Sequence, residues 1–527
     1  MWLMDENDTE ILIEALQDPA LYDHPVRGFT VLETHISWVI LTGDYAYKIK
    51  KPVRFDFLDF SPLALRRQYC REELRLNGRY AADLYLQVVE IYGSPRHPSF
   101  QGDGEPQEYA VKMRQFPQEA LLSRLAGRGG LQDKHIDAMA EEIAEFHGRA
   151  ARADSADACG RPDRVRQWAL ENFDEIRPLL HDRTALAQLE EVYVWTEEEY
   201  QRRLDELEER KRGGGIRECH GDLHLGNMFL QGDRIRLFDC IEFNRELRWI
   251  DVMSEAAFVI MDLCDRNEPA FGQRFLNRYL QHTGDYGGLG ALAYYFVYRA
   301  LVRAKVTLLR LSQGHQNEKE SAGVWDVYRG YVDLARGMCR RPPPLLLITH
   351  GVSGSGKSHL AAPLSERLNA VHVRSDIERK RLYGYGMEAR TGSALESGIY
   401  TPEASARTYS RLEEIAAAAL NGGYPVVIDA AFLKREQRRR FLDLGRRLGV
   451  ETVILDFQAP ETVLRGRILQ RQAAGGDPSE AGVDVLESQL RNQEPLTQEE
   501  RCFSFAVNGD DPGGVAGRLR GMNRRVP

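Results

Sequence analysis

The chain has 527 residues, which is too long for one hydrophobic core, so several domains are expected. Its 43% hydrophobic and 28% charged content is that of an ordinary globular protein, and its net charge of −9 argues against a broad nucleic-acid-binding surface. Seven scattered cysteines without a Cys-x-x-Cys pair exclude a disulfide framework and predict reduced thiols. The acidic N-terminus and the lack of a long apolar run lead us to expect a cytoplasmic protein without a membrane span.

The first hundred or so residues alternate between helical and strand patterns. Three β-rich runs separated by turn residues predict an antiparallel meander: 31–33, 38–42 and 45–50. Because strand side chains alternate, the third run places Lys48 and Lys50 on one face. These lysines either protect an edge strand or pair with a phosphate. In the second case a glutamate on the following helix, Glu72 or Glu73, could fix the position of the lysine.

A mostly helical, charged region at about 118–212 leads to a second polar cluster, which reads His220-Gly-Asp222-Leu-His-Leu-Gly-Asn227. A short strand then ends on Asp239. Amide and carboxylate oxygens are hard ligands that suit Mg²⁺, so Asn227 and Asp239 could hold the ion on nucleotide phosphates. Asp222 could orient a substrate hydroxyl and accept its proton. We expect His220 to support the loop by hydrogen bonding rather than to act as the base.

Two alternatives remain for this cluster. His220 and His224 are four residues apart, which is a spacing found in zinc sites, but a third ligand is missing and the glycines indicate a loop. The segment could also be a polar surface turn without a chemical role.

The strongest motif follows three consecutive prolines, Pro342 to Pro344, which end the preceding domain near residue 341. An apolar run at 345–350 predicts one buried strand, and the segment from Lys357 onward predicts a helix. Between them lies a phosphate-binding loop made of Gly351, Val352, Ser353, Gly354, Ser355, Gly356, Lys357 and Ser358. Its backbone amides would cradle phosphate oxygens, Lys357 would reach the β- and γ-phosphates, and Ser358 would hold Mg²⁺.

After this loop, strands and helices alternate to residue 507, which predicts a parallel sheet covered on both faces. Asp429 follows an apolar run and suits a Walker-B-type residue that orders the Mg²⁺ shell. Asp376, expected at the end of a strand at 371–375, would accept the proton of the acceptor hydroxyl.

Two arginines complete the expected chemistry of this part. Arg467 and Arg471 lie four apart on one predicted helix, ahead of a lid-like segment at 473–480. Closure of the lid would bring both guanidinium groups to the transferring phosphoryl group. Alternatively, they belong to a solvated helix face.

The polar loop from His220 to Asn227, followed by Asp239, resembles the catalytic and metal loops of the aminoglycoside phosphotransferase and choline-kinase group. This resemblance covers roughly 30–340 and implies a protein-kinase-like fold. It implies Asp222 as the base, Asn227 and Asp239 as Mg²⁺ ligands, Lys48 as the phosphate-contacting lysine, Glu73 as its partner with Glu72 as an alternative, and 108–114 as the hinge beside adenine. The chain departs from protein kinases in two ways. The turn at 33–38 has no glycine, so the amides of 34–37 would cover the nucleotide, and Asp239 is not followed by Phe-Gly.

The C-terminal pattern resembles the P-loop kinase group that includes gluconate kinase, polynucleotide 5′-kinases and zeta-toxin-like kinases. The matching features are Val-Arg-Ser-Asp376, Val-Ile-Asp429-Ala-Ala-Phe and Arg467-x-x-x-Arg471. Together the halves resemble a bacterial family of fused proteins labelled bifunctional aminoglycoside phosphotransferase/ATP-binding protein.

We therefore predict an α+β, protein-kinase-like bilobal domain at 1–340, with lobes at about 1–116 and 117–340, and an α/β P-loop kinase domain with a parallel sheet at 341–527. Each would transfer a γ-phosphoryl group from Mg·ATP to a hydroxyl group of a small molecule. Three alternatives stay open: a non-catalytic N-terminal regulator, a P-loop kinase acting on nucleic-acid 5′ ends, and an ATP-driven switch without an acceptor. The acceptors, any coupling of the sites and the oligomeric state are not predicted.

Overall fold

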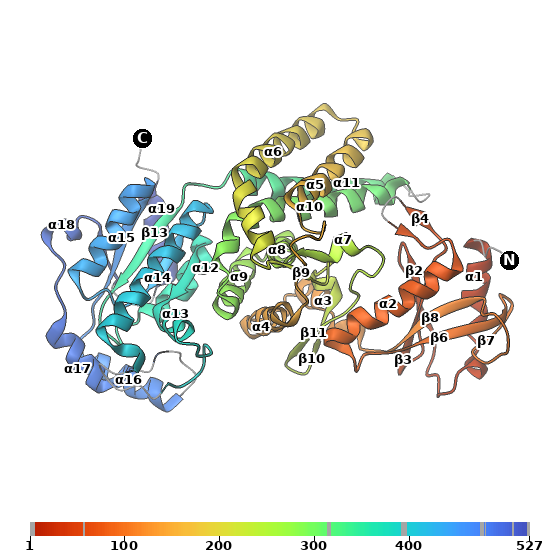
Figure 1. Cartoon of the computed structure of the whole chain (residues 1–527), viewed down its shortest axis with the longest axis horizontal. Coiled ribbons are helices and arrows are strands. Elements are labelled where there is room, and N and C mark those ends of the chain that lie inside the picture. The colour runs from red at the N-terminus through yellow and green to blue at the C-terminus, as the bar shows by residue number, and fades with distance from the viewer. Residues whose placement is uncertain are drawn as a thin grey trace. The chain divides into compact units, whose positions relative to one another are not determined.

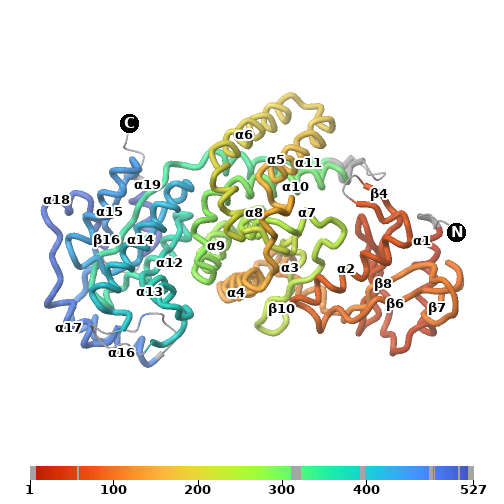
Figure 2. Tube along the Cα trace, viewed as in Figure 1, coloured from red at the N-terminus to blue at the C-terminus, as the bar shows by residue number. Residues whose placement is uncertain are grey.

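A computed structural model describes residues 6–55, 58–312, 318–391, 398–474, 479, 481–507 and 511–523. The chain forms two compact units, whose elements can be followed by colour in Figure 1 and Figure 2. Unit 1 comprises Met1–Val165 and Glu209–Asp262, and unit 2 comprises Arg166–Glu208 and Leu263–Pro527. The helices of 263–340 therefore belong to the same compact unit as the P-loop part. The boundary near residue 341 stays a prediction.

Unit 1 contains a six-stranded antiparallel sheet with the order β1-β2-β3-β8-β6-β7. Its strands are β1 Thr30–Glu33, β2 Ser37–Leu41, β3 Tyr45–Lys50, β6 Tyr85–Ser94, β7 His97–Ser99 and β8 Glu108–Arg114. The meander expected from the sequence is present, and β6 and β7 add two strands that the sequence reasoning did not identify.

Alternation along β3 divides its side chains between two helices. Tyr47 and Ile49 pack in an apolar cluster with α1 (Glu6–Ala15), whereas Lys48 and Lys50 point to the other face and reach α2 (Leu63–Ala81). The apolar residues anchor the strand, so its two lysines are held at fixed positions on the opposite face.

The rest of unit 1 builds the loop that carries the polar cluster. Its elements are β4 Arg54–Phe55, β5 Leu58–Asp59, α3 Leu122–Gly127, α4 Asp133–Arg149, β9 Ile216–Glu218, β10 Met228–Gln231, β11 Arg234–Leu237, α7 Arg245–Arg248, β12 Trp249–Asp251 and α8 Val252–Asp265. Strands β10 and β11 form a hairpin that turns at Gly232, and the short helix η4 (Leu225–Asn227) precedes it. Asp239 lies two residues beyond the end of β11, after Phe238. The expected strand before this aspartate is therefore confirmed.

Unit 2 contains a five-stranded parallel sheet with the order β14-β15-β13-β16-β17. Its strands are β13 Leu345–His350, β14 Val371–Arg374, β15 Val426–Asp429, β16 Glu451–Phe457 and β17 Ser504–Val507. The helices of this region are α12 Lys357–Leu368, α13 Ser375–Leu382, α14 Pro402–Asn421, α15 Arg435–Leu448, α16 Glu461–Ala474, α17 Val483–Asn492, α18 Gln498–Arg501 and α19 Pro512–Asn523. The predicted parallel sheet is confirmed, and the phosphate-binding loop follows its central strand.

Helices from before residue 341 complete unit 2: α5 Pro162–Ile176, α6 Arg183–Arg212, α9 Pro269–Thr283, α10 Leu289–Ser312 and α11 Glu318–Cys339. Helix α9 packs against α12 and the edge strand β14. Gln273 Nε2 donates to the carbonyl oxygen of Ala370 at 2.8 Å, and the side-chain oxygen of Asn277 accepts from the backbone N–H of His372 at 2.9 Å. These amides satisfy backbone groups that an edge strand would otherwise leave unpaired. No helix in the described part of the chain combines the length and the apolarity needed to cross a bilayer.

Two candidate nucleotide sites

Lys48 lies at the centre of a buried ion-pair network in unit 1. Its Nζ donates to Glu73 Oε1 at 2.9 Å and also contacts the carboxylate of Asp239. Lys50 Nζ donates to Glu73 Oε2 at 2.7 Å. Burial alone would raise the pKa of Glu73, but the two lysines outweigh it and lower this pKa to about 2. Glu73 therefore stays ionised and holds the lysine; Glu72, the alternative partner, binds Arg75 and Arg248 instead.

The polar loop brings Asp222 and Asn227 together. Asn227 Nδ2 donates to the backbone oxygen of Asp222 at 2.9 Å and to its Oδ2 at 3.1 Å. The backbone N–H of Phe238 donates to the backbone oxygen of Asn227 at 3.1 Å, which ties the loop to the residue before Asp239. Asp222, Asn227, Asp239 and Lys48 thus converge in unit 1, although 191 positions separate Lys48 from Asp239.

His220 stabilises this loop through hydrogen bonds on its buried side. The side chain is fully buried, its Nε2 lies 2.7 Å from the backbone oxygen of Phe238, and burial lowers its pKa. His224 Nδ1 accepts from the backbone N–H of Gly226 at 3.0 Å. Since the ring nitrogens of both histidines serve the loop itself, the zinc alternative has no support in this geometry.

Glu255 on α8 is a part of the site that the sequence reasoning missed. Its carboxylate accepts from the backbone N–H of His220 at 3.0 Å and from that of Gly221 at 2.6 Å, and its Oε2 lies 2.9 Å from His147 Nε2. Gly221 has a φ of 90°, and a Cβ there would lie 2.7 Å from the backbone oxygen of Leu247. The turn that presents Asp222 therefore requires glycine and a buried acceptor for its amides.

The donor set of unit 1 fits a hard divalent cation. Because the Nδ2 of Asn227 donates to Asp222, the Oδ1 of Asn227 remains available as a ligand. Asp239 adopts a φ of 65°, a left-handed conformation that is uncommon outside glycine, and its backbone N–H donates to the hydroxyl of Tyr85 at 3.0 Å. A non-glycine residue kept in this conformation is typical of a functional position.

The turn between β1 and β2 differs from the expectation that its amides cover a nucleotide. The backbone N–H of Thr34 donates to the backbone oxygen of Ser37 at 2.8 Å, and the N–H of Ser37 donates to Thr34 Oγ1 at 2.9 Å. The backbone N–H of Ile36 also donates to Thr34 Oγ1, at 3.3 Å. Three of the four expected amides are therefore already hydrogen-bonded within the turn.

The phosphate-binding loop of unit 2 connects β13 to α12 and requires glycine at close approaches. Gly354 has a φ of 81°, and a Cβ there would lie 2.8 Å from the backbone oxygen of Leu464. The Nζ of Lys357 donates to the backbone oxygen of Val352 at 2.8 Å, inside the loop. Gln489 on α17, which sequence reasoning did not identify, accepts from the backbone N–H of Ser353 at 2.7 Å.

A cavity of about 770 Å³ adjoins this loop and gathers the predicted residues of unit 2. Its lining includes Lys357, Ser358, Asp376, Asp429, Arg467 and Arg471. The guanidinium of Arg471 donates to Ser353 Oγ at 3.3 Å, and that of Arg467 donates to the backbone oxygen of Gly354 at 3.4 Å. These two contacts favour a role at the loop over a solvated helix face. The expected lid at 473–480 falls largely outside the described residues.

Two acidic residues line this cavity, and one prediction about them was wrong. Asp429 ends β15 as expected, and its Oδ2 lies 3.3 Å from His372 Nε2. Burial would raise the pKa of Asp429, but His372 and then Arg374 and Ser358 lower it to about 2. Asp376 does not end a strand, because β14 stops at Arg374 and Asp376 lies in the first turn of α13. An aspartate there is stabilised by the helix dipole, which the strand assignment overlooked.

Both halves of the chain match families of known proteins. Residues 46–292 match the model of the phosphotransferase enzyme family, and residues 346–496 match a model described as an AAA domain. The protein Rv2004c of Mycobacterium tuberculosis (strain ATCC 25618 / H37Rv) is 32% identical over 462 residues, which cover 86% of this chain and 89% of that protein. The chain belongs to this fused phosphotransferase and P-loop kinase family. The protein Mb2027c of Mycobacterium bovis (strain ATCC BAA-935 / AF2122/97) matches with the same identity and coverage.

Solved structures resemble the two parts separately. A choline/ethanolamine kinase family protein from Mesorhizobium loti is 11% identical with a TM-score of 0.38, covering 63% of this chain and 95% of its own. A gluconokinase from Sinorhizobium meliloti 1021 is 21% identical with a TM-score of 0.25, covering 35% of this chain and 94% of its own. Membership of the fused family rests on the mycobacterial relatives and the two family models. It makes the chain a kinase-type enzyme with a phosphotransferase part followed by a P-loop part.

Proposed function

We propose that the chain carries two independent Mg·ATP sites, each of which transfers the γ-phosphoryl group to a hydroxyl group of a small molecule. The observation that carries this proposal is the convergence of Lys48, Asp222, Asn227 and Asp239 in unit 1. A lysine, a carboxylate and hard oxygen ligands are the groups that phosphoryl transfer by positioning and charge neutralisation requires.

In unit 1, Lys48 binds the phosphates of ATP and Glu73 keeps its ammonium group in place. Asn227 and Asp239 hold Mg²⁺, which neutralises charge on the phosphates when it is bound. Asp222 orients the acceptor hydroxyl and takes its proton. Because Asn227 donates to Asp222, the same amide side chain fixes the base and offers its oxygen to the ion.

In unit 2, the backbone amides of the loop 351–358 and Lys357 bind the phosphates at the start of α12. Ser358 and Asp429 hold Mg²⁺, and the adjacent His372 keeps Asp429 ionised. Asp376 accepts the proton of the hydroxyl group. The guanidinium groups of Arg467 and Arg471 neutralise charge on the transferring phosphoryl group.

Small-molecule acceptors are favoured over nucleic acid for two reasons. The unit 2 cavity of about 770 Å³ lies within the usual size range of small-molecule sites. The net charge of −9 disfavours a polyanion as partner. All seven cysteines are free, which fits a reducing cytoplasm.

The test uses the full chain with γ-labelled ATP, Mg²⁺ and a metabolite extract, and compares wild type with Asp222→Asn and Lys357→Ala. We expect two sets of labelled products, one lost in each variant. If Asp222→Asn keeps every product and Lys357→Ala loses every product, unit 1 is a regulator. Release of inorganic phosphate without any labelled metabolite would replace the proposal by an ATP-driven switch, and salt-sensitive labelling of an oligonucleotide would move unit 2 to nucleic-acid ends.

A further inference from the structure

A groove of about 620 Å³ lies in unit 1 between helix α2 and the segment 242–248. Five arginines and two glutamates line it, which leaves an excess of three positive charges: Arg67, Arg71, Arg75, Arg245, Arg248, Glu72 and Glu242. None of the predicted nucleotide-site residues Lys48, Glu73, Asp222, Asn227 and Asp239 is among its lining residues. The groove is therefore a separate feature of the unit.

Helix α2 presents one face to the ion-pair network around Lys48 and another face to the groove. Glu73 on one face is fully buried and binds Lys48 and Lys50. The groove face repeats at helical spacing, with Arg67, Arg71 and Arg75 each four residues apart. Glu73 and the three arginines thus lie on different faces of one helix. Glu242, which lines the groove, contacts Lys50 and so links the groove to the ion-pair network around Glu73.

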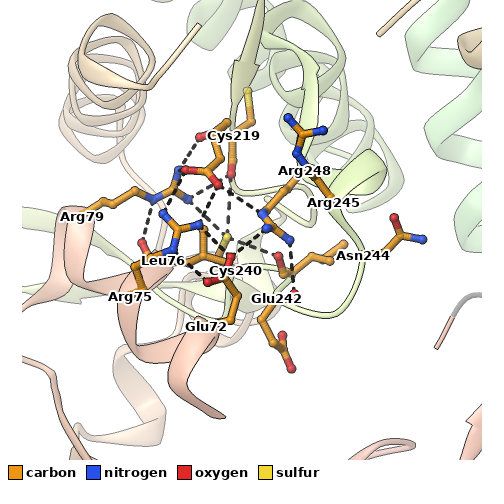
Figure 3. A network of polar contacts seen from close by, with 12 residues as sticks. Glu72, Arg75, Leu76, Arg79, Cys219, Cys240, Glu242, Asn244, Arg245 and Arg248 are labelled. Atoms are coloured by element: carbon orange, nitrogen blue, oxygen red, sulfur yellow. Dashed lines mark hydrogen bonds and ion pairs between the residues drawn. The ribbon is translucent and has the colours of Figure 1, made fainter. Parts of the chain in front are cut away.

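The floor of the groove is a fixed polar network (Figure 3). Arg248 is only 6% exposed, and its guanidinium donates to Glu72 Oε1 at 2.8 Å and to the backbone oxygen of Glu242 at 3.2 Å. Arg75 donates to the carboxylates of Glu72 and Glu218, each with a shortest distance of 2.7 Å. These bonds hold two guanidinium groups at the groove in set orientations before any ligand arrives.

The outer arginines are not neutralised in this way. Arg67 and Arg71 are exposed, and neither forms an ion pair with a described residue. The guanidinium carbon of Arg67 lies 5.5 Å from the centre of the Tyr109 ring, which orients the group without cancelling its charge. A solvated helix face would account for the spacing of Arg67 and Arg71 alone. Arg245 and Arg248 line the same hollow from another segment, but they are already paired, Arg245 with Asp157 and Arg248 with Glu72.

We propose that this groove binds a small molecule bearing a phosphate group. A guanidinium offers parallel N–H donors that match phosphate and carboxylate oxygens alike, but not a halide. The excess of positive charge favours a phosphate, which carries up to two negative charges, over a carboxylate, which carries one. The volume is that of a small-molecule site, and Tyr69 and Phe243 line it beside the arginines. The phosphate binds at Arg67 and Arg71, where the positive charge has no carboxylate partner among the described residues.

The experiment is calorimetric titration of the full chain with inorganic pyrophosphate in the absence of Mg²⁺. Wild type is compared with the double variant Arg67→Gln/Arg71→Gln. The matched control is Arg124→Gln/Arg128→Gln, at α3 and the residue that follows it, which removes the same charge from exposed residues of the same unit, outside the groove. Because the nucleotide sites also bind pyrophosphate, the readout is the number and affinity of the separate binding phases.

We expect wild type and the control to share one binding phase that is weakened by about a hundredfold in the groove variant, since two charge-assisted contacts are lost. The other phases should be the same in all three proteins. If the groove variant keeps every phase with unchanged affinity, or if the control loses the same phase, the site is disproved. Equal melting temperatures of the three proteins exclude misfolding as the cause of a lost phase.

Discussion

Nε2 of His147 lies 2.9 Å from Oε2 of Glu255, and both side chains are buried. The same carboxylate accepts hydrogen bonds from the backbone N–H groups of His220 and Gly221. One acidic side chain on α8 thus fixes the turn that presents Asp222. The geometry of the proposed base depends on a residue that touches no substrate.

Replacing this anchor should reduce both stability and turnover. Glu255→Ala leaves two buried amides and His147 without their acceptor, so we expect a loss of about 3 kcal/mol in the free energy of unfolding. The unit 1 reaction should lose mainly kcat, because the base is misplaced, while the Lys357-dependent reaction is unchanged. Urea unfolding and the two labelled-product rates measure this; a Glu255→Ala protein with wild-type stability and kcat would contradict it.

The contribution of Glu255 to the free energy of unfolding should also depend on pH. Burial would raise its pKa, but the hydrogen bond and charge of His147 lower it to about 2, below the ordinary 4.5. A carboxyl group with a lowered pKa in the folded state stabilises the fold above its ordinary pKa and loses that contribution as the pH falls.

We therefore expect the difference in unfolding free energy between wild type and Glu255→Gln to be greatest above about pH 5 and to shrink as the pH falls toward about 3. Urea unfolding of both proteins across this range measures it. A difference that is constant with pH would show that the carboxylate charge is not involved.

His372 should act on the reaction of unit 2 by positioning Asp429. Its Nε2 lies 3.3 Å from the carboxylate, and its backbone is held by Asn277. We expect His372→Ala to weaken the apparent Mg²⁺ affinity of the Lys357-dependent reaction by about tenfold, as loss of an outer-shell partner usually does. His97→Ala, an exposed histidine in unit 1, is the control. An unchanged Mg²⁺ dependence in His372→Ala would show that His372 does not position Asp429 for the ion.

A pair of glycines separates steric from conformational effects in unit 2. Gly354 and Gly384 both have positive φ, but a Cβ at Gly354 would lie 2.8 Å from a backbone oxygen, whereas a Cβ at Gly384 meets nothing within 4 Å. We expect Gly354→Ala to abolish ATP binding at the loop and Gly384→Ala to preserve it, at a similar cost in backbone strain. Equal ATP affinity in the two variants, measured by calorimetry, would contradict the close approach.

Local patterns allowed much of this site to be predicted. The strand, the glycine loop and the helix of unit 2 are contiguous, so residues 351–358 were assigned from spacing alone. Alternation along β3 placed Lys48 and Lys50 on one face, and both bind Glu73. Placing Lys48 and Asp239 in one site needed the family resemblance, because 191 positions separate them, and their direct contact was not predicted.

The parts that were not predicted depend on packing between distant segments. Nothing in the apolar pattern of α8 indicates that Glu255 points at a loop more than thirty residues earlier. The assignment of Asp376 failed because one residue decides whether it ends a strand or starts a helix, and element boundaries are the weakest part of pattern reasoning. The contact of α9 with β14 arises from amide side chains that look like ordinary helix residues in the sequence.

Calorimetric titration of the full chain with AMP-PNP and Mg²⁺ tests the two-site account most directly. We expect two molecules bound per chain in wild type and one in each of Lys48→Ala and Lys357→Ala, with none in the double variant. A single bound molecule in wild type, or a stoichiometry that neither substitution changes, would contradict the account.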